Sequence, residues 1–410
     1  MKILIVTNVA TKGSVGGILS ILKEGFKDRG NDVRICYGYY SDHPVDEEYK
    51  KICTSMEFKL SAILTRLTGL EGIFNPFSLK RVITEIESYK PDIVQLMNLH
   101  AYYINSFKLL DYLKRNELQT VYSMFDAFSF TGKCPFPMDC NKYLTSCSDC
   151  NQKKEYPRSA FFDRTSYMFK QKEEAYSNYP KLHFVGGIGI INQAKKSALL
   201  HNKSIHLIDE PQDLDNLFFP KDTAQLKEKL GIPQNNKVVI AAAPLESGTN
   251  RKQGYLFLDL FHRMENVTGY SFVYIGFNTT KYGNPEKLIK IPYVNSPLEF
   301  SRYLSLGDVL FFTSVADTTS CTVIDALACG TPVVGFNIEG MACFNINDKD
   351  VMYLAKVGDM DEVESVIRGI SRKDDVIINK CRDSVYKTFN KTCIVDKYLN
   401  LYKSLLSHDN

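Results

Sequence analysis

The chain has 410 residues, of which 44% are hydrophobic and 24% charged, a balance typical of a folded globular protein. This length suits two α/β domains better than one core. A formal net charge of only +3 argues against a dominant basic face, so nucleic acid is not an expected partner. No apolar run approaches the roughly 20 residues that span a bilayer. Eleven cysteines, an odd number, favour a reducing cytoplasm over a disulfide framework.

The first forty residues predict the opening unit of a Rossmann-like domain. An apolar run at 3–6, too short for a signal peptide, predicts a buried strand, and a glycine-rich segment at 11–17 follows it. Apolar residues then recur at helical spacing until Gly30. Glycines at a helix start expose backbone N–H groups to an anion, so Gly16 and Gly17 are candidate donor-binding residues. The alternative is a tight turn without a ligand.

The rest of the chain continues the alternation of strands and helices. Further strands are expected at 92–96, 120–124, 183–185, 237–242, 271–275, 309–313 and 332–336. Helices are expected at 107–113, 224–230, 255–264, 300–304, 322–329 and 392–407. The pattern predicts an α/β fold of two Rossmann-like, doubly wound domains that face each other across a cleft. The expected divisions are an N-terminal domain at 1–205, a linker at 206–220, a C-terminal domain at 221–385 and a helix at 386–410 that packs back on the N-terminal domain.

Two segments interrupt this alternation. The linker is acidic, and we interpret its carboxylates as a solvated hinge rather than a metal site. Residues 131–158 have no clear period and predict a long loop, a kind of segment that is often functional. The loop contains Cys134, Cys140, Cys147 and Cys150. Four thiolates at this spacing suit a structural Zn²⁺, and the alternative is a set of reduced thiols packed in a small hydrophobic insert.

One segment after the strand at 309–313 combines two acids with a helix start. Asp317 follows the strand, and Asp325 lies eight positions later, in the first turn of the next helix, with Ser320 as its N-cap. The N–H groups of a helix start suit a phosphate, and a carboxylate accepts hydrogen bonds from a pair of sugar hydroxyls. The segment therefore suits a ligand that carries both a diphosphate and a polyol. The alternative is an ordinary capped helix with incidental acids.

This segment resembles the E-x7-E signature of the retaining family 4 glycosyltransferases of GT-B fold, with Asp317 and Asp325 in place of the two glutamates. The stretch Ala328-Cys-Gly-Thr-Pro-Val-Val is similar to the closing ACGTPVV of that family. Further similarities, over about residues 1–405, are the glycine loop at Gly13, Gly16 and Gly17, Pro91-Asp-Ile-Val, the segments that begin at Asn98 and Asp126, Leu230-Gly-Ile-Pro, and Arg251-Lys252. Together they resemble the branch that builds bacterial capsular, exopolysaccharide and lipopolysaccharide O-antigen chains.

The resemblance implies roles for the matching residues. Asp325 would hold the ribose hydroxyls of the nucleotide, and Asp317 would contact the transferred sugar. Arg251 and Lys252 would neutralise the diphosphate leaving group, so that catalysis needs no metal ion or other cofactor. The remaining donor-binding residues would be Gly16, Gly17, Gly276, Ser320, Cys321 and Thr322, the last three through backbone N–H groups at the distal phosphate.

The sequence also departs from the family pattern. The usual Leu-His-Asp reads Met-Phe-Asp here, so Phe125 stands where a histidine near the reacting carbon is expected. We count Asp126 and His100, a candidate substitute, among the catalytic residues; a structural role for the histidine is the alternative. The usual Arg-Lys-Gly reads Arg-Lys-Gln-Gly, and an ungapped alignment places Gln253 on the lysine position. The usual Pro-Asn of the linker reads Asp-Glu at 209–210.

The expected function is that of a hexosyltransferase that moves a sugar, with retention, from a UDP-sugar or GDP-sugar to a growing polysaccharide or a polyprenyl-diphosphate-linked acceptor. It is expected in the cytoplasm, with peripheral contact to the inner face of the membrane through lysine pairs such as Lys153-Lys154 and Lys195-Lys196. No motif favours a sugar-nucleotide epimerase or a phosphorylase. The alternative is a catalytically degenerate GT-B subunit that binds the donor or a partner transferase.

Overall fold

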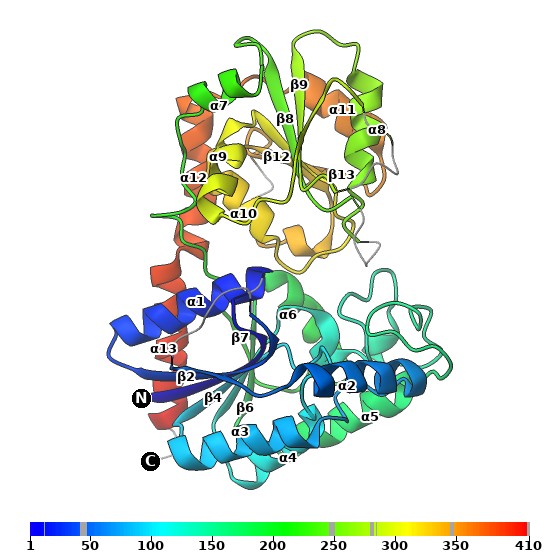
Figure 1. The fold of residues 1–410 in the computed structure, drawn as a ribbon, viewed down its shortest axis with the longest axis vertical. Helices are drawn as coiled ribbons and strands as arrows, with labels where there is room; N and C mark the ends of the chain where they lie inside the picture. Colours follow the sequence, from blue (N-terminus) through cyan, green and yellow to red (C-terminus); the bar gives the residue numbers. More distant parts are fainter. Residues whose placement is uncertain are drawn as a thin grey trace. The chain divides into compact units, whose positions relative to one another are not determined.

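The chain folds into two compact units. The computed structural model describes residues 1–11, 13–41, 47–245, 251–278, 283, 285–344 and 348–407. Unit 1 comprises Met1–Pro211 together with Ile394–Asn410, and unit 2 comprises Gln212–Cys393. In each unit, helices cover a parallel β-sheet (Figure 1).

Unit 1 is built on a sheet whose described strands have the order β3-β2-β1-β4-β5-β6-β7. The strands are β1 (Lys2–Val9), β2 (Asp32–Tyr40), β3 (Tyr49–Lys51), β4 (Ile93–Met97), β5 (Thr120–Ser123), β6 (Leu182–Gly186) and β7 (Ile205–Leu207). The strands β2 and β3 lie on one side of β1, and β4 to β7 lie on the other. The switch in strand order that characterises a doubly wound sheet therefore lies between β1 and β4. All five residues of β4 are buried because helices cover both faces of the sheet.

The helices of unit 1 precede, connect and follow these strands. They are α1 (Gly13–Asp28), α2 (Ser55–Thr68), α3 (Pro76–Tyr89), α4 (Ser106–Arg115), α5 (Thr165–Tyr176) and α6 (Ile188–Ala194), with short 3-10 turns η1 (Ala127–Phe130) and η2 (Lys142–Leu144). The predicted loop at 131–158 contains η2 and no other helix or strand. Among the described residues, no helix is long and apolar enough to cross a membrane.

Unit 2 repeats the architecture with the strand order β10-β9-β8-β11-β12-β13. Its strands are β8 (Lys237–Ala242), β9 (Tyr270–Ile275), β10 (Leu288–Ile291), β11 (Val309–Phe312), β12 (Val333–Phe336) and β13 (Met352–Ala355). Its helices are α7 (Ala224–Lys229), α8 (Tyr255–Met264), α9 (Pro297–Leu306), α10 (Cys321–Ala328), α11 (Met360–Gly369) and α12 (Asp375–Phe389), with the 3-10 turn η3 (Glu339–Met341). The switch in strand order lies between β8 and β11. Two doubly wound sheets are therefore present, as the sequence predicts.

The last helix, α13 (Lys391–Ser407), belongs to unit 1 from Ile394 onward. Its apolar face packs against α1, where the rings of Tyr398 and Tyr402 lie 6.2 and 5.7 Å from the ring of Phe26. The prediction of one helix at 386–410 is wrong at its start. The first residues of that range are the end of α12, and Asn390 separates α12 from α13.

The acidic segment that joins the units is not a solvated hinge. β7 is the last strand of the unit 1 sheet, and the side chains of Asp209 and Glu210 that follow it are buried. Burial raises the pKa of the Asp209 carboxyl above its ordinary value. Gln212 then forms a parallel bridge with Asn390, which fixes the start of unit 2. Acidic runs are usually exposed. Here the backbone leaves the core of unit 1 and enters that of unit 2 within a few residues, so these two acids are buried.

Candidate functional site

The switch in strand order of unit 2 brings two loops together. β8 and β11 are neighbours in the sheet, and β11 leads into residues 313–320, called the β11 loop below. The backbone N–H of Val315 donates to the carbonyl oxygen of Arg251 at 2.8 Å, and the Thr313 hydroxyl donates to the carbonyl oxygen of Lys252 at 2.6 Å. Ligands of doubly wound sheets bind at the carboxyl ends of the strands beside this switch.

Asp317 lies between the two cations of this site. Its Oδ1 is 3.3 Å from Arg251 Nη1, and its Oδ2 is 3.0 Å from Lys252 Nζ. Both cationic side chains are 21% exposed, so solvent reaches them. Two cations against one carboxylate leave a net positive charge that attracts an anionic ligand. Lys252 is thus the residue that pairs with Asp317, whereas Gln253 adopts a left-handed backbone conformation with a φ of 39°.

Four buried side-chain oxygens in and after the β11 loop have no hydrogen-bond partner among the described residues. They are Ser314 Oγ, Thr319 Oγ1, Ser320 Oγ and Asp325 Oδ1. Buried polar atoms in native proteins nearly always have a partner, because leaving one unpaired costs about 1–3 kcal/mol. Their concentration in one loop and the helix after it indicates that a polar ligand completes the site.

The helix α10 begins where the β11 loop ends. Ser320 occupies the predicted N-cap position, but its hydroxyl makes no capping hydrogen bond, so the prediction is correct for the position only. The first N–H groups of an α-helix lack intrahelical partners and favour an anion. Asp325 is the fifth residue of α10 and so lies in its second turn, not its first as predicted. Burial raises the pKa of the Asp325 carboxyl well above its ordinary value.

Unit 1 presents a second polar group at the carboxyl ends of β4 and β5. His100 follows β4, Asp126 follows β5, and His100 Nε2 lies 2.8 Å from Asp126 Oδ2. The other ring nitrogen, Nδ1, is 2.9 Å from the Tyr156 hydroxyl. The second oxygen of Asp126 accepts a hydrogen bond from the Phe128 N–H at 2.9 Å. A carboxylate that holds one ring nitrogen orients the imidazole and leaves Nδ1, beside the Tyr156 hydroxyl, as the nitrogen that can exchange a proton.

The turn that carries this histidine is strained. Asn98, Ala101 and Tyr102 have φ values of 50°, 82° and 61°, a region that residues other than glycine rarely adopt. Glu71 Oε1 accepts the Tyr102 N–H at 2.9 Å, and the Asn75 side-chain amide donates to the Tyr102 carbonyl oxygen. Such strain persists only where the surroundings hold it, and it is concentrated at functional sites.

We expect the free energy of unfolding to depend on pH through Glu71. Burial raises the pKa of its carboxyl from 4.5 to about 7, with the Tyr102 N–H and nearby His100 acting in the opposite direction. The folded state therefore binds this proton more tightly than the unfolded state. The stability that Glu71 contributes is complete below its ordinary pKa and is lost as the pH rises through its folded pKa.

The variant Glu71→Gln should remove about 3 kcal/mol of this pH dependence. Urea denaturation of both proteins between about pH 4.5 and pH 7.5 measures it. Parallel curves of the free energy of unfolding against pH for the two proteins would contradict the assignment. Glu87→Gln, a change at an exposed carboxyl on α3, is the control that should leave the dependence in place.

The turn η1 is held by a buried lysine. Lys172 Nζ donates to the carbonyl oxygens of Phe128 and Thr131, the latter at 2.9 Å, and lies 3.6 Å from the centre of the Phe128 ring. Burial lowers the pKa of the Lys172 ammonium to about 7. The sequence does not predict this lysine, Glu71 or Tyr156 as site residues, because contacts between distant segments leave no local pattern. Tyr156 carries one weak signal, its place in the long loop.

The glycines predicted to bind the donor differ in their surroundings. A Cβ at Gly16 would lie 2.2 Å from the carbonyl carbon of Thr11, so the packing of α1 requires glycine there. Gly276 has a φ of +90°, and its N–H donates to the carbonyl oxygen of Ile291 at 2.9 Å. Gly17 is exposed, and apart from its chain neighbours and the backbone of its own helix, no described atom lies within 4 Å of the place its Cβ would take. Packing and backbone conformation account for the first two glycines, and space beside Gly17 is open to a ligand.

The cysteine loop at 131–158 contains no group of metal ligands in the structure. Among the described residues, no three His, Cys, Asp or Glu side chains are grouped to hold a metal ion. Burial raises the pKa of the Cys134 thiol to about 12 and raises the pKa values of Cys147 and Cys150, so these thiols stay neutral at pH 7. Structural zinc stays a sequence prediction, which elemental analysis of the purified chain decides.

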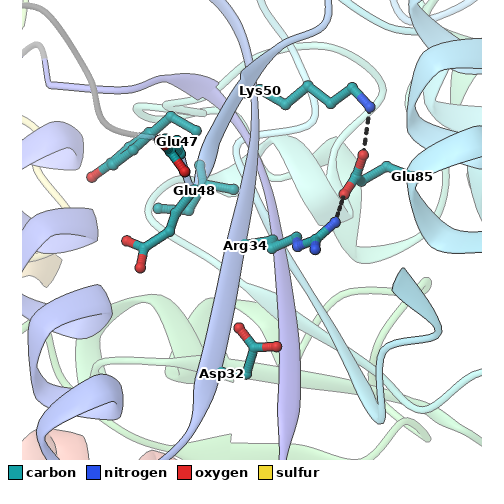
Figure 2. Close-up of a pocket in the computed structure, with 8 residues that line it drawn as sticks. Asp32, Arg34, Glu47, Glu48, Lys50 and Glu85 are labelled. Carbon is teal, nitrogen blue, oxygen red and sulfur yellow. Dashed lines mark hydrogen bonds and ion pairs between the residues drawn. The ribbon is translucent and has the colours of Figure 1, made fainter. Parts of the chain in front are cut away.

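A separate pocket of about 500 Å³ lies between β2, β3 and α3 (Figure 2). Both cations that line it, Arg34 and Lys50, pair with the buried Glu85 carboxylate, which lies 2.7 Å from Arg34 Nη1 and 2.5 Å from Lys50 Nζ. The pocket is lined by Asp32, the first residue of β2. It therefore lies by the amino end of that strand, away from the carboxyl ends where ligands of such sheets bind. We assign it a structural role.

A protein-family model matches part of the chain. Residues 236–372 match the model of the family described as "Glycosyl transferases group 1". This range covers a third of the chain, lies inside unit 2, and contains both the cation pair and the β11 loop.

Two curated proteins are similar in sequence. The N-acetyl-alpha-D-glucosaminyl L-malate synthase of Bacillus anthracis is 23% identical over 218 residues, which are 51% of this chain and 56% of that protein. The chain thus matches little more than half the length of that relative. The putative colanic acid biosynthesis glycosyl transferase WcaC of Escherichia coli (strain K12) is 20% identical, over 96% of this chain and 97% of that protein.

Solved structures match over nearly the whole length. A sucrose-phosphate synthase from Thermosynechococcus elongatus has a TM-score of 0.70 at 14% identity and covers 100% of both chains. Anabaena HepE in complex with UDP has a TM-score of 0.69 at 13% identity and covers 98% of this chain and 100% of its own. The glycosyltransferase WaaG has a TM-score of 0.62 at 11% identity, with 98% and 99% covered. These likenesses confirm the predicted fold class, the GT-B fold with two Rossmann-like domains.

Proposed function

We propose that the chain, whose residues 236–372 form a group 1 glycosyltransferase domain, moves a sugar from a nucleoside-diphosphate donor to a growing glycan. Transfer proceeds with retention at the anomeric carbon and without a metal ion. One observation carries the proposal: buried oxygens without a described partner lie in the β11 loop and α10, and this loop contacts the two cations that follow β8. A nucleoside-diphosphate sugar supplies the anionic and polyol groups that such a site binds.

The diphosphate binds between the start of α10 and the cation pair. Backbone N–H groups of Ser320, Cys321 and Thr322 receive the distal phosphate. Cleavage of the bond between sugar and diphosphate places negative charge on the leaving group, and Arg251 and Lys252 stabilise that charge in the transition state. This is the part that a divalent metal plays in other transferases, so the cations support a metal-independent reaction.

The sugar and the nucleoside are held by the two acids. Asp325 accepts hydrogen bonds from the ribose hydroxyls, and Asp317 contacts the transferred sugar once the donor phosphates share its cations. Solved structures of Anabaena HepE contain UDP and UDP-glucose, which favours uridine over guanosine as the donor base. The open space beside Gly17 supports an approach of the donor to α1.

Unit 1 receives the acceptor, and the His100–Asp126 pair there supports handling of a proton on the acceptor hydroxyl. The names of WcaC and WaaG refer to colanic acid and lipopolysaccharide biosynthesis, which supports a polysaccharide or lipid-linked glycan as the acceptor. A polyprenyl-diphosphate carrier would require cytoplasmic protein at the inner face of the membrane, with peripheral contact to the lipid.

A thermal-shift series tests donor binding. UDP should raise the Tm of the chain, by an amount that corresponds to about 2.7 kcal/mol when its concentration is 100 times the Kd. GDP and ADP should raise it less, and uridine, which lacks the diphosphate, should have no effect. Hydrolysis of UDP-sugars is then measured with the same protein. If no nucleoside diphosphate raises the Tm, the proposal is wrong; binding without turnover of any sugar nucleotide would favour the degenerate subunit.

A further inference from the structure

The helix α2 exposes four of its large apolar residues and buries small ones. The exposed residues are Met56 (77%), Leu60 (55%), Ile63 (52%) and Leu67 (46%). The residues that face the core are the buried Ser61, Ala62 and Thr65, together with the partly buried Phe58. A helix at the surface of a globular domain normally has the opposite arrangement. Its apolar face therefore contributes nothing to the core of unit 1, which points to a role outside it.

The exposed residues form one continuous stripe. Their spacing of four, three and four positions confines them to about 60° of the helix circumference. Lys59 and Arg66 are also exposed and lie together on one flank of the stripe. The side chain of Glu57, the acid of this helix, pairs with Arg81 at 2.9 Å and caps the helix through the Thr54 N–H.

A second exposed segment adjoins the C-terminal end of α2. The Ala160 N–H donates to the carbonyl oxygen of Arg66 at 2.7 Å. The rings of Phe161 and Phe162, 65% and 52% exposed, follow directly and form an edge-to-face pair 6.4 Å apart. The Arg164 guanidinium lies 5.2 Å from the centre of the Phe162 ring. We call these residues, with the stripe and its two cations, the α2 surface.

We propose that the α2 surface docks on an anionic lipid bilayer. Aromatic and aliphatic side chains next to cations are the combination that binds such an interface, since the apolar groups enter the headgroup region and the cations meet the lipid phosphates. The exposed cations Lys59, Arg66 and Arg164 complement that charge. Asp163 is engaged within its own loop, through the N–H groups of Cys150 and Thr165.

A second copy of the chain fits this surface less well. A two-fold contact would place the same patch against itself and so bring like charges together, because the cations of the patch would face one another. A bilayer has no such cost. The loop that carries Phe161 also reaches the candidate site of unit 1. Tyr156, a few residues before Phe161, contacts His100 at 2.9 Å. Docking here would bring the acceptor side of unit 1 to a lipid-borne substrate.

Vesicle flotation of the full chain tests the inference. Vesicles of phosphatidylethanolamine with phosphatidylglycerol supply the anionic surface, and phosphatidylcholine vesicles supply the neutral one. The chain should partition about tenfold more strongly onto the anionic vesicles. The double variant Leu60→Gln/Ile63→Gln should lose about tenfold or more of that binding. The variant Lys59→Gln/Arg66→Gln should bind more weakly and with a smaller dependence on salt.

The matched control is Tyr293→Gln/Val376→Gln, which removes two exposed apolar side chains of unit 2 and should bind like the unchanged chain. Equal partition onto both vesicle types, or unchanged binding of the Leu60→Gln/Ile63→Gln protein, would overturn the inference. So would sedimentation showing a dimer that this variant converts to a monomer. The inference extends the proposed function, and the UDP-dependent Tm shift of each variant keeps the two apart, because it reports donor binding and not lipid binding.

Discussion

Replacing Lys252 by methionine should lower the rate of sugar transfer by about 10²- to 10³-fold, while the Kd of the donor changes only a few-fold. The ammonium lies 3.0 Å from Asp317 in the free protein, so part of its attraction for a phosphate is already balanced before the donor arrives. Its full effect appears when charge develops on the leaving diphosphate. Steady-state kcat and KM, with the Kd from calorimetry, measure the two effects separately.

The surface lysine Lys380 provides the control for this variant. It also pairs with an acid of unit 2, Asp350 at 3.1 Å, but lies outside the β11 loop region. Lys380→Met should therefore leave kcat unchanged. Arg251→Met should lower the transfer rate as Lys252→Met does, because both cations form ion pairs with the Asp317 carboxylate. If both site variants transfer sugar at the original rate, the leaving group is stabilised elsewhere and the site assignment is wrong.

The sequence predicts the buried parallel strands well because each is a short apolar run between polar turns. The bounds of β8 and α8 in the structure are those expected at 237–242 and 255–264. The strands β10 and β13 were not predicted, since each has half-exposed residues at its centre and lies at one end of its sheet. The alternation of strands and helices nevertheless sufficed for the fold class.

The helix α2 was missed for a related physical reason. Helix prediction from apolar spacing assumes that the apolar face is the buried one. In α2 the stripe from Met56 to Leu67 faces outward, and Ser61 and Thr65 face the core. The pattern was present in the sequence, but its meaning depends on what lies against the helix. The buried Asp209 and Glu210 show the same limit for charged residues.

The candidate site was predictable only in part. Asp317 and Asp325 follow one strand, so a single segment reveals them both. The pairing of His100 with Asp126 is different, because these residues follow two strands whose adjacency, β4 beside β5, appears only in the sheet. The family resemblance implies each of the two residues separately. The hydrogen bond between them came from the structure.

Replacing Asp325 by asparagine should weaken donor binding about 10- to 100-fold and, at the same time, stabilise the free protein by about 1–3 kcal/mol. The carboxyl is buried, one of its oxygens has no partner among the described residues, and burial raises its pKa well above the ordinary value of 3.8. Its folded-state pKa exceeds the unfolded one, so this carboxyl favours folding only at low pH. The stabilisation by asparagine should therefore be absent below about pH 4 and grow as the pH rises.

Asp308, directly before β11, distinguishes this assignment from a general effect of buried acids. It is also buried in unit 2, but its oxygens accept hydrogen bonds from the backbone N–H groups of Val238 at 2.8 Å and Lys373 at 3.2 Å. Asp308→Asn should destabilise the fold and leave the Kd of the nucleotide unchanged, the reverse of Asp325→Asn on both measurements. Urea denaturation and nucleotide titration of the two variants settle the matter. A loss of stability in Asp325→Asn without a loss of affinity would mean that the carboxyl serves the core of unit 2, since an acid kept for a ligand costs stability until that ligand is bound.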